Sequence, residues 1–483
     1  MAAHTPLSNP DIAPIPLAAR TWNWWHYCAL WIGMSVCITT YTLASGLIDS
    51  GMSWRQAMVT IFLGNTIVLL PMLLNAHAGA KYGIPFPVFA RASFGVLGAN
   101  VPALLRALVA CGWFGIQTWI GGAALYQLAK AVWPGVAALP AVLPSFVGLT
   151  TGEFAGFLVF WLMNLWFIVK GTESIKGLES VAAPFLIVVG LVLLGWAYVR
   201  AGGFGPMLSQ PSRFPTFAAF WPVFLPSLTA MVGYWATLSL NIPDFSRYAK
   251  TQRDQVVGQA LGLPTTMALY SFIGVAVTSA TTIIFKETLW NPVDVLTRFN
   301  SPAVLVIAMV SLCIATLATN IAANVVSPAN DFAHLAPKMI SFRIGGYITG
   351  VIGILMMPWK LVSDPNGYIF TWLIAYSALL GPIGGILIAD YFVWRKRTLN
   401  VSALYQAKGE YRFTNGFSVV ALVAFGLGAL PSLPGFLVQV KVLPTDAVPA
   451  SLAHLYNYAW FIGFAIAFVA YLVGRTLSEQ RRA

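Results

Sequence analysis

Apolar runs long enough to cross a lipid bilayer recur along almost the whole of this chain. A membrane-spanning helix needs about 20 mostly apolar residues, because the hydrocarbon core is roughly 30 Å thick and a helix rises about 1.5 Å per residue. The runs lie at 26–48, 55–75, 97–129, 146–169, 178–199, 217–242, 258–285, 302–326, 342–362, 367–393, 416–437 and 455–475. We therefore expect an all-α integral membrane protein with 12 transmembrane helices.

Charged side chains are scarce enough to exclude an ordinary soluble protein. Only 9% of the 483 residues are charged and 58% are hydrophobic, whereas a soluble domain carries about 25% charged residues. No charged, loop-rich segment is long enough to form a separate soluble domain. The expected surroundings of the chain are therefore the lipid bilayer.

The net charge of +12 is explained by membrane topology rather than by nucleic-acid binding. An even number of spans places both termini on one side. If that side is the cytoplasm, the opposite side receives only eight of the 27 Lys and Arg residues, namely Arg55, Lys130, Arg200, Arg213, Lys286, Arg298, Lys360 and Lys441. This bias follows the positive-inside rule. We expect a protein of the cell (inner) membrane with cytoplasmic tails at 1–25 and 476–483, the first of them flexible.

Two of the spans are interrupted by residues that disfavour a continuous helix. The first reads WIGMSVCITTYTLASG around Gly33, and the sixth reads FLPSLTAMVGYWATLSLNIPDF around Gly233. Span three carries Gln117 and span eight carries Asn324. Each half of the chain therefore has one interrupted span and one span with a polar amide. The two glycines are 200 residues apart and the two amides 207. This near-constant offset indicates two related halves.

The halves are expected to be inverted relative to each other. Each contains five spans, 26–200 in the first and 217–393 in the second, and an odd number reverses the direction of the second half. Two additional helices occupy 416–475. Inverted repeats with broken helices one and six are typical of secondary transporters, which bind their substrate at the breaks. The alternative is that the small residues only allow helices to pack closely, but packing explains neither the amides nor the matched offset.

Four polar or aromatic residues are the candidate substrate-binding residues. Trp113 and Gln117 are four residues apart, which places them on one face of a helix, and an unpaired amide in hydrocarbon costs several kcal/mol. Trp113 and Trp235 could hold a planar ring between their indoles. Gln117 and Asn324 each offer a donor and an acceptor to the edge of an amide-containing ring. The alternatives are that the indoles pack or anchor the protein at the interface, and that the amides form an interhelical hydrogen bond.

No catalytic or cofactor motif is evident, so we do not expect an enzyme. The chain lacks a Walker phosphate loop and the HExxH and GxSxG motifs, and its few acidic residues fall near the estimated span ends. A sodium ion is the one possible metal. It would be held by backbone carbonyls near Gly33 and Val36, by the Ala315 carbonyl and by the Thr319 hydroxyl, because broken helices supply such oxygen ligands.

Several segments of the chain resemble the nucleobase–cation symporter-1 family of hydantoin, allantoin, uracil and cytosine permeases. They are GWFGIQTWIGG (112–122), YWATLSLNIPDFSRYAK (234–250), TNIAANVVSPANDF (319–332), MMPWK (356–360) and GPIGGILIADYFVWRKR (381–397). The resemblance runs from about Trp22 to about Gly416. It implies a leucine-transporter-like, five-plus-five inverted repeat that works by alternating access. It also implies stacking by Trp113 and Trp235, and ring pairing by Gln117 and Asn324.

This chain departs from the family's hydantoin transporter at three of the matched positions. The sodium positions correspond to Gly33, Val36, Ala315, Ala318 and Thr319, but the hydantoin transporter has serine where this chain has Ala318. Tyr234 stands in place of glycine and narrows the pocket or adds a hydrogen bond. Cys37 stands in place of glutamine. The substrate and the coupling ion of that transporter are therefore not carried over.

The expected function is import of a small amide-containing heterocycle, such as allantoin, uracil, hydantoin or a related nucleobase, by a secondary symporter. The driving gradient is of protons or of sodium ions. The alternative function is an uncoupled channel or facilitator for the same solutes, whose transport persists when ion gradients are collapsed. An integral membrane enzyme lacks a catalytic constellation here, and a signalling receptor lacks a cytoplasmic segment long enough for a signalling domain.

Overall fold

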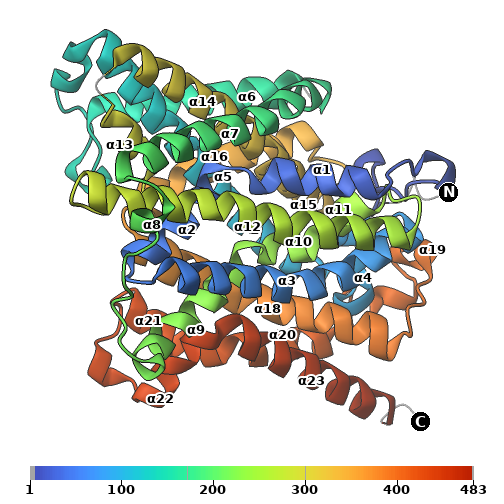
Figure 1. The fold of residues 1–483 in the computed structure, drawn as a ribbon. Coiled ribbons are helices and arrows are strands. Elements are labelled where there is room, and N and C mark those ends of the chain that lie inside the picture. The colour runs from blue at the N-terminus through green and yellow to red at the C-terminus, as the bar shows by residue number, and fades with distance from the viewer. Residues whose placement is uncertain (1–5, 171, 300, 481–483) are drawn as a thin grey trace.

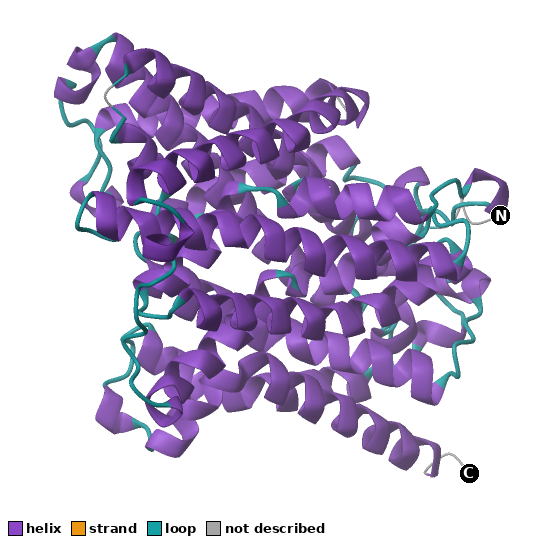
Figure 2. Ribbon diagram, viewed as in Figure 1, coloured by secondary structure: helices purple, strands orange, loops and turns teal. Residues whose placement is uncertain are grey.

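The computed structural model describes residues 6–170, 172–299 and 301–480, and in these ranges the chain is almost entirely helical (Figure 2). The long helices run side by side, and the two chain ends lie at the same end of the bundle (Figure 1). This arrangement agrees with the predicted all-α fold class.

Nine helical segments in the described part of the chain are long and apolar enough to cross a membrane. They are Trp54–Tyr82 (α3), Asn100–Val132 (α5), Thr151–Val169 (in α6), Phe217–Tyr234 (α9), Gln252–Ile284 (α12), Ala303–Leu335 (α14 and α15), Asn366–Trp394 (around α18), Val419–Gln439 (from α20 to α21) and Ala450–Gln480 (ending in α23). The predicted run at 55–75 is shorter than α3, which contains it, the run at 97–129 is displaced by three residues from α5, and the run at 258–285 begins six residues after the start of α12.

The first predicted span is a bent helix pair rather than a continuous helix. Helix α1 (Trp24–Ser35) and helix α2 (Ile38–Asp49) differ in direction by 60°. Counted as one span, the pair brings the total to ten. The predicted runs at 178–199 and 342–362 correspond to α7 (Thr172–Ala201) and α16 (Phe342–Leu355). Their described apolar lengths, Ile187–Ala201 and Phe342–Leu355, are shorter than a full crossing.

The sixth predicted span is also interrupted. Helix α9 ends at Tyr234, and α10 (Ala236–Asn241) and α11 (Pro243–Ser246) follow it. Trp235 lies at the break with φ −103° and ψ 6°. The prediction of broken first and sixth helices is thus confirmed, and both breaks lie next to buried polar side chains.

Glycines allow several of the helices to approach closely. A Cβ atom on Gly122 of α5 would lie 2.5 Å from the Cα atom of Phe157 in α6, and one on Gly64 of α3 would lie 2.3 Å from the Cβ atom of Met231 in α9. Small residues serve this purpose in membrane helix bundles, where apolar surface alone gives little driving force for association. The packing alternative for the glycines therefore holds at these positions and also at Gly233, where a Cβ atom would lie 2.8 Å from the Leu373 carbonyl oxygen, but not at Gly33, where it would meet no atom within 4 Å.

The described part of the N-terminal segment is packed against the helices, so the prediction of a flexible tail is wrong for it. Ile12 is fully buried, and its carbonyl accepts a hydrogen bond from the Tyr405 hydroxyl at 2.8 Å. The Arg91 guanidinium donates to the Leu7 carbonyl at 2.9 Å, and the Arg247 guanidinium donates to the Asp11 carbonyl at 2.9 Å. Buried arginines that need acceptors thus hold this segment in place.

Candidate functional site

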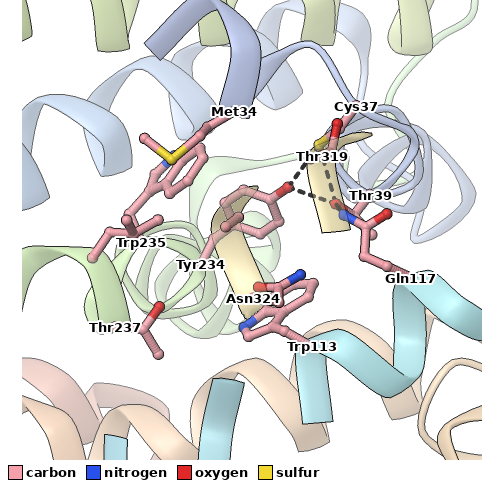
Figure 3. Close-up of a pocket in the computed structure, with 12 residues that line it drawn as sticks. Met34, Cys37, Thr39, Trp113, Gln117, Tyr234, Trp235, Thr237, Thr319 and Asn324 are labelled. Carbon is pink, nitrogen blue, oxygen red and sulfur yellow. Dashed lines mark hydrogen bonds between the residues drawn. The ribbon is translucent and has the colours of Figure 1, made fainter. Parts of the chain in front are cut away.

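A small cavity lies where the two broken spans meet α5 and α14 (Pro302–Asn324) (Figure 3). Its volume is about 30 Å³, which is room for one or two water molecules. The lining residues are Met34, Cys37, Thr39, Trp113, Gln117, Tyr234, Trp235, Thr237, Leu238, Thr319, Ala323 and Asn324. All four predicted substrate-binding residues line this one cavity, although they come from three separate regions of the sequence.

The break between α1 and α2 presents a polar stretch of chain to the cavity. Val36 ends α1 with φ −81° and ψ 77°, and Cys37 precedes α2 in an extended conformation without a side-chain cap. Cys37 and Thr39 therefore lie beside the cavity at the start of α2, where the first backbone N–H groups of a helix lack helical partners. Thr39 belongs to the threonine-rich stretch of the first span, and that composition was its sequence signal.

Helix α5 contributes Trp113 and Gln117 one turn apart, as their spacing predicts. The Gln117 side-chain Nε2 donates to the Thr39 Oγ1 at 3.4 Å, while its Oε1 has no partner. The indole Nε1 atoms of Trp113 and Trp235 also have no partner. An unpaired buried polar atom costs about 1–3 kcal/mol. Three of them around one cavity therefore indicate a place where a polar ligand completes the hydrogen bonding.

Asn324, the last residue of α14, is oriented by a chain of buried amides. Its Nδ2 donates to the Asn320 Oδ1 at 3.0 Å, and the Asn320 Nδ2 lies 3.1 Å from the Asn164 Oδ1 in α6. The same Nδ2 lies 3.1 Å from the Thr118 Oγ1 and 3.2 Å from the Phe114 carbonyl. With its Nδ2 bound to Asn320, Asn324 is left with its Oδ1 as a free acceptor. The single amide in the fourth span is the only sequence signal for Asn164, and we did not predict its role.

The two predicted stacking indoles are separated by the ring of Tyr234 (Figure 3). The Tyr234 ring centroid lies 5.2 Å from that of Trp113, with an interplanar angle of 82°. It lies 4.9 Å from that of Trp235, with an angle of 87°. Tyr234 thus stands edge-on to both indoles. The gap between the indoles that we predicted for a substrate ring is partly filled by this phenol.

The Tyr234 hydroxyl connects the two broken spans. It lies 2.8 Å from the Thr39 Oγ1, 3.0 Å from the Thr40 Oγ1 and 3.5 Å from the Cys37 Sγ. Thr39, Thr40 and Cys37 all belong to the start of the second half of the first span. The residue that ends α9 is therefore tied to the residues that begin α2.

Of the residues considered for sodium, Thr319 lines the cavity, whereas Gly33, Val36, Ala315 and Ala318 do not. Val36, Ala315 and Ala318 are buried, and Val36 and Ala315 belong to the same apolar cluster. Ala318 offers no side-chain oxygen. Among the described residues, no group of three or more His, Cys, Asp or Glu side chains could hold a metal ion.

Two carboxylates, one on α11 and one on the helix that follows α14, are buried. We expected these acidic residues near span ends; they are near helix ends but fully covered. Asp331 of α15 (Val326–Leu335) pairs with Arg106 of α5 at 3.0 Å, and both side chains are about 1% exposed or less. Asp244 of α11 accepts from the Phe86 backbone N–H at 2.8 Å and from the Ser327 hydroxyl at 3.1 Å. These contacts join α11 and α15 to the surrounding helices.

Comparison with known proteins identifies relatives over nearly the whole chain. Residues 14–463 match the model of a family described as permeases for cytosine/purines, uracil, thiamine and allantoin. The purine-uracil permease NCS1 of Arabidopsis thaliana is 47% identical over 98% of this chain and 79% of its own length. The allantoin permease of Bacillus subtilis is 42% identical over 97% of this chain and 93% of its own.

Comparison with solved structures gives the same result for the fold. A structure of Mhp1, a nucleobase-cation-symport-1 family transporter, in a closed conformation with bromovinylhydantoin bound, superposes with a TM-score of 0.79. The two chains are 25% identical, and the match covers 98% of this chain and 96% of Mhp1. The leucine-transporter-like fold expected from the sequence is thus confirmed.

Proposed function

The chain belongs to the nucleobase–cation symporter-1 family of permeases for cytosine/purines, uracil, thiamine and allantoin, and on that premise we propose that it imports a small ring with amide N–H groups, allantoin or uracil first among them. It is an integral membrane transporter and not an enzyme. The observation that carries the choice of substrate is the set of unpartnered polar atoms around the cavity between the broken helices.

We assign substrate recognition to Gln117 and Asn324 and ring contact to Trp113 and Trp235. As oriented, both amides face the cavity with a free carbonyl oxygen, since the Gln117 Nε2 binds Thr39 and the Asn324 Nδ2 binds Asn320. Two acceptors suit a ring that carries two N–H groups. A substrate without them would leave both oxygens unpaired, and such a site discriminates strongly against it.

Coupling is proposed to use protons rather than sodium. The candidate sodium ligands are the carbonyls of Gly33, Val36 and Ala315 and the hydroxyl of Thr319, and Ala318 contributes no oxygen to them. A site with one ligand fewer holds a hard cation less well, because oxygen ligands replace its hydration shell. We therefore expect uptake to respond to external pH and to continue when sodium is replaced by choline.

The same proposal covers topology and repeat organisation. We assign residues 26–200 and 217–393 to inverted five-helix halves, 416–475 to two additional helices, and both tails to the cytoplasm of a cell (inner) membrane protein. The Lys and Arg distribution supports this orientation. Alternating access would then move the substrate from the outside to the cytoplasm.

Binding to the purified protein tests the substrate assignment. Tryptophan fluorescence would be titrated with uracil, allantoin, hydantoin and 1,3-dimethyluracil, the last of which lacks N–H groups. We expect Gln117→Ala and Asn324→Ala each to weaken binding tenfold or more, because an unpaired buried group costs about 1–3 kcal/mol. Asn65→Ala is the matched control, since Asn65 is a buried amide of α3 outside the cavity. Unchanged affinity in both site variants, or equal affinity for 1,3-dimethyluracil, would contradict the assignment.

A transport assay separates the symporter from a facilitator. Proteoliposomes would be loaded with a proton gradient, a sodium gradient or neither, and uptake of radiolabelled uracil or allantoin followed. A symporter accumulates the solute above its external concentration only when one gradient is present. Uptake to equal concentrations under every condition would mean that the chain is an uncoupled facilitator.

A further inference from the structure

We propose that Tyr234 sets the upper size limit of the substrate: its ring occupies the space that a ring substituent would need and confines the site to small, unbranched heterocycles. This inference rests on the proposed function, because it concerns the cavity assigned there to substrate. It adds a specificity-determining residue to the four recognition residues.

The position of the phenol is the first argument. Its centroid is about 5 Å from both indoles, 5.2 Å from Trp113 and 4.9 Å from Trp235, and the free volume beside it is about 30 Å³. A cavity that binds benzene in a protein interior measures about 150 Å³, so the site must widen to admit even a single small ring. A substrate bearing an aryl group would need the volume that the Tyr234 ring fills.

The attachment of the phenol is the second argument. Its hydroxyl is bonded to Thr39 and Thr40, and the carbonyl of the preceding residue, Gly233, accepts a hydrogen bond from the Tyr376 hydroxyl at 2.8 Å. The ring is therefore fixed at its far end and at its backbone. The neighbouring indoles have no hydrogen bond at Nε1. Trp235 packs edge-on against Trp31 and Trp113 against Trp372, so the indoles are held by ring packing, whereas Tyr234 is also held by hydrogen bonds and forms the more rigid wall.

Two substitutions distinguish the effect of the Tyr234 ring from the effect of its hydroxyl. Tyr234→Phe keeps the ring and removes the bonds to Thr39 and Thr40. Tyr234→Ala removes the ring and leaves a space of phenyl size between the indoles. If volume sets the limit, only the alanine variant admits a substituted substrate.

The experiment compares uracil, hydantoin and 5-benzylhydantoin as ligands of the purified protein, again by tryptophan fluorescence. We expect the unmodified chain to bind 5-benzylhydantoin at least tenfold more weakly than hydantoin. Tyr234→Ala should bind 5-benzylhydantoin at least tenfold more tightly than the unmodified chain does. Tyr234→Phe should stay within threefold of the unmodified chain for that ligand.

Leu238→Ala is the matched control, because Leu238 lines the same cavity and its truncation leaves the Tyr234 ring in place. It should not gain affinity for 5-benzylhydantoin. Should Tyr234→Ala fail to fold, as judged by thermal unfolding and gel filtration, Tyr234→Leu removes the ring while keeping the site filled in part, and the same gain is expected in smaller measure.

The outcomes distinguish the two proposals. If the unmodified chain binds none of the small rings, the proposed function is wrong. If it binds uracil or hydantoin, and binds 5-benzylhydantoin equally well, the size limit is wrong and the proposed function stands. A gain in Tyr234→Phe equal to that in Tyr234→Ala, or a gain in Leu238→Ala, would also overturn the assignment to the Tyr234 ring.

Discussion

Asn320 offers a sharp test of how the site is held in shape. It does not line the cavity, yet its Oδ1 accepts from the Asn324 Nδ2 at 3.0 Å. We predict that Asn320→Leu, which keeps the approximate side-chain volume and removes every polar atom, weakens substrate binding through Asn324 alone.

The size of the effect follows from the bonds that disappear. The Asn320 Nδ2 has three acceptors within 3.2 Å, on Phe114, Thr118 and Asn164, but only two hydrogens to donate. Asn320→Leu therefore removes about three bonds and leaves the Asn324 Nδ2 and the Asn164 Oδ1 unpaired. Each unpaired group costs about 1–3 kcal/mol. If the site loses the orientation of Asn324, binding should weaken by about 1.4 kcal/mol or more, which is tenfold or more in Kd.

A double-mutant cycle separates orientation from general damage. Dissociation constants for uracil or allantoin would be measured for Asn320→Leu, Asn324→Ala and the double variant, each with its thermal unfolding temperature. If Asn320 acts only through Asn324, the double variant binds no more weakly than Asn324→Ala, because the effect of the first change disappears once the second residue is absent. Additive losses, or an unchanged Kd in Asn320→Leu, would refute the reasoning.

Three further results are expected. Arg106→Met, which leaves Asp331 as a buried unpaired charge, should lower the free energy of unfolding by about 3–5 kcal/mol. The double variant Arg106→Met with Asp331→Leu should recover most of that loss. A loss below about 1 kcal/mol in the single variant, measured by thermal or denaturant unfolding, would contradict this. Gly122→Ala, whose Cβ would lie 2.5 Å from the Phe157 Cα, should reduce the yield of folded protein in gel filtration, whereas Gly195→Ala, which meets no atom within 4 Å, should not. Ala318→Ser, which adds an oxygen beside Thr319, should increase the stimulation of proteoliposome uptake by sodium; no change would argue against a cation position there.

Periodicity and composition predict much of the fold, and the reason is physical. A segment that crosses hydrocarbon must satisfy its own backbone, so an apolar run of sufficient length is a helix. The two interruptions are visible because Gly33, Gly233 and Pro226 disfavour continuous helix in otherwise apolar runs. The amides are visible because lipid gives Gln117 and Asn324 no partner. These features depend on the residue and its immediate surroundings, which the sequence contains.

Packing between distant segments is what the sequence did not reveal. The threonines of the first span suggested a helix break, but not that Thr39 and Thr40 bind the hydroxyl of Tyr234 about 195 residues away. Asn164 looked like one polar residue in an apolar span, and its role depends on Asn320 of another helix. The contact between Ile12 and Tyr405 could not be predicted either, because these residues are almost 400 positions apart in the sequence.

Tyr234 shows why residue identity and residue position carry different information about specificity. From the sequence, a phenol beside Trp235 either narrows a pocket or adds a hydrogen bond. In the structure it does both, because the hydroxyl binds α2 while the ring separates the two indoles. The hydrogen bond makes the narrowing effective, since an untethered ring could rotate away when a larger ligand entered. The bond also joins the ends of the two broken spans, so the residue that limits substrate size is fixed by the same helix breaks that create the cavity.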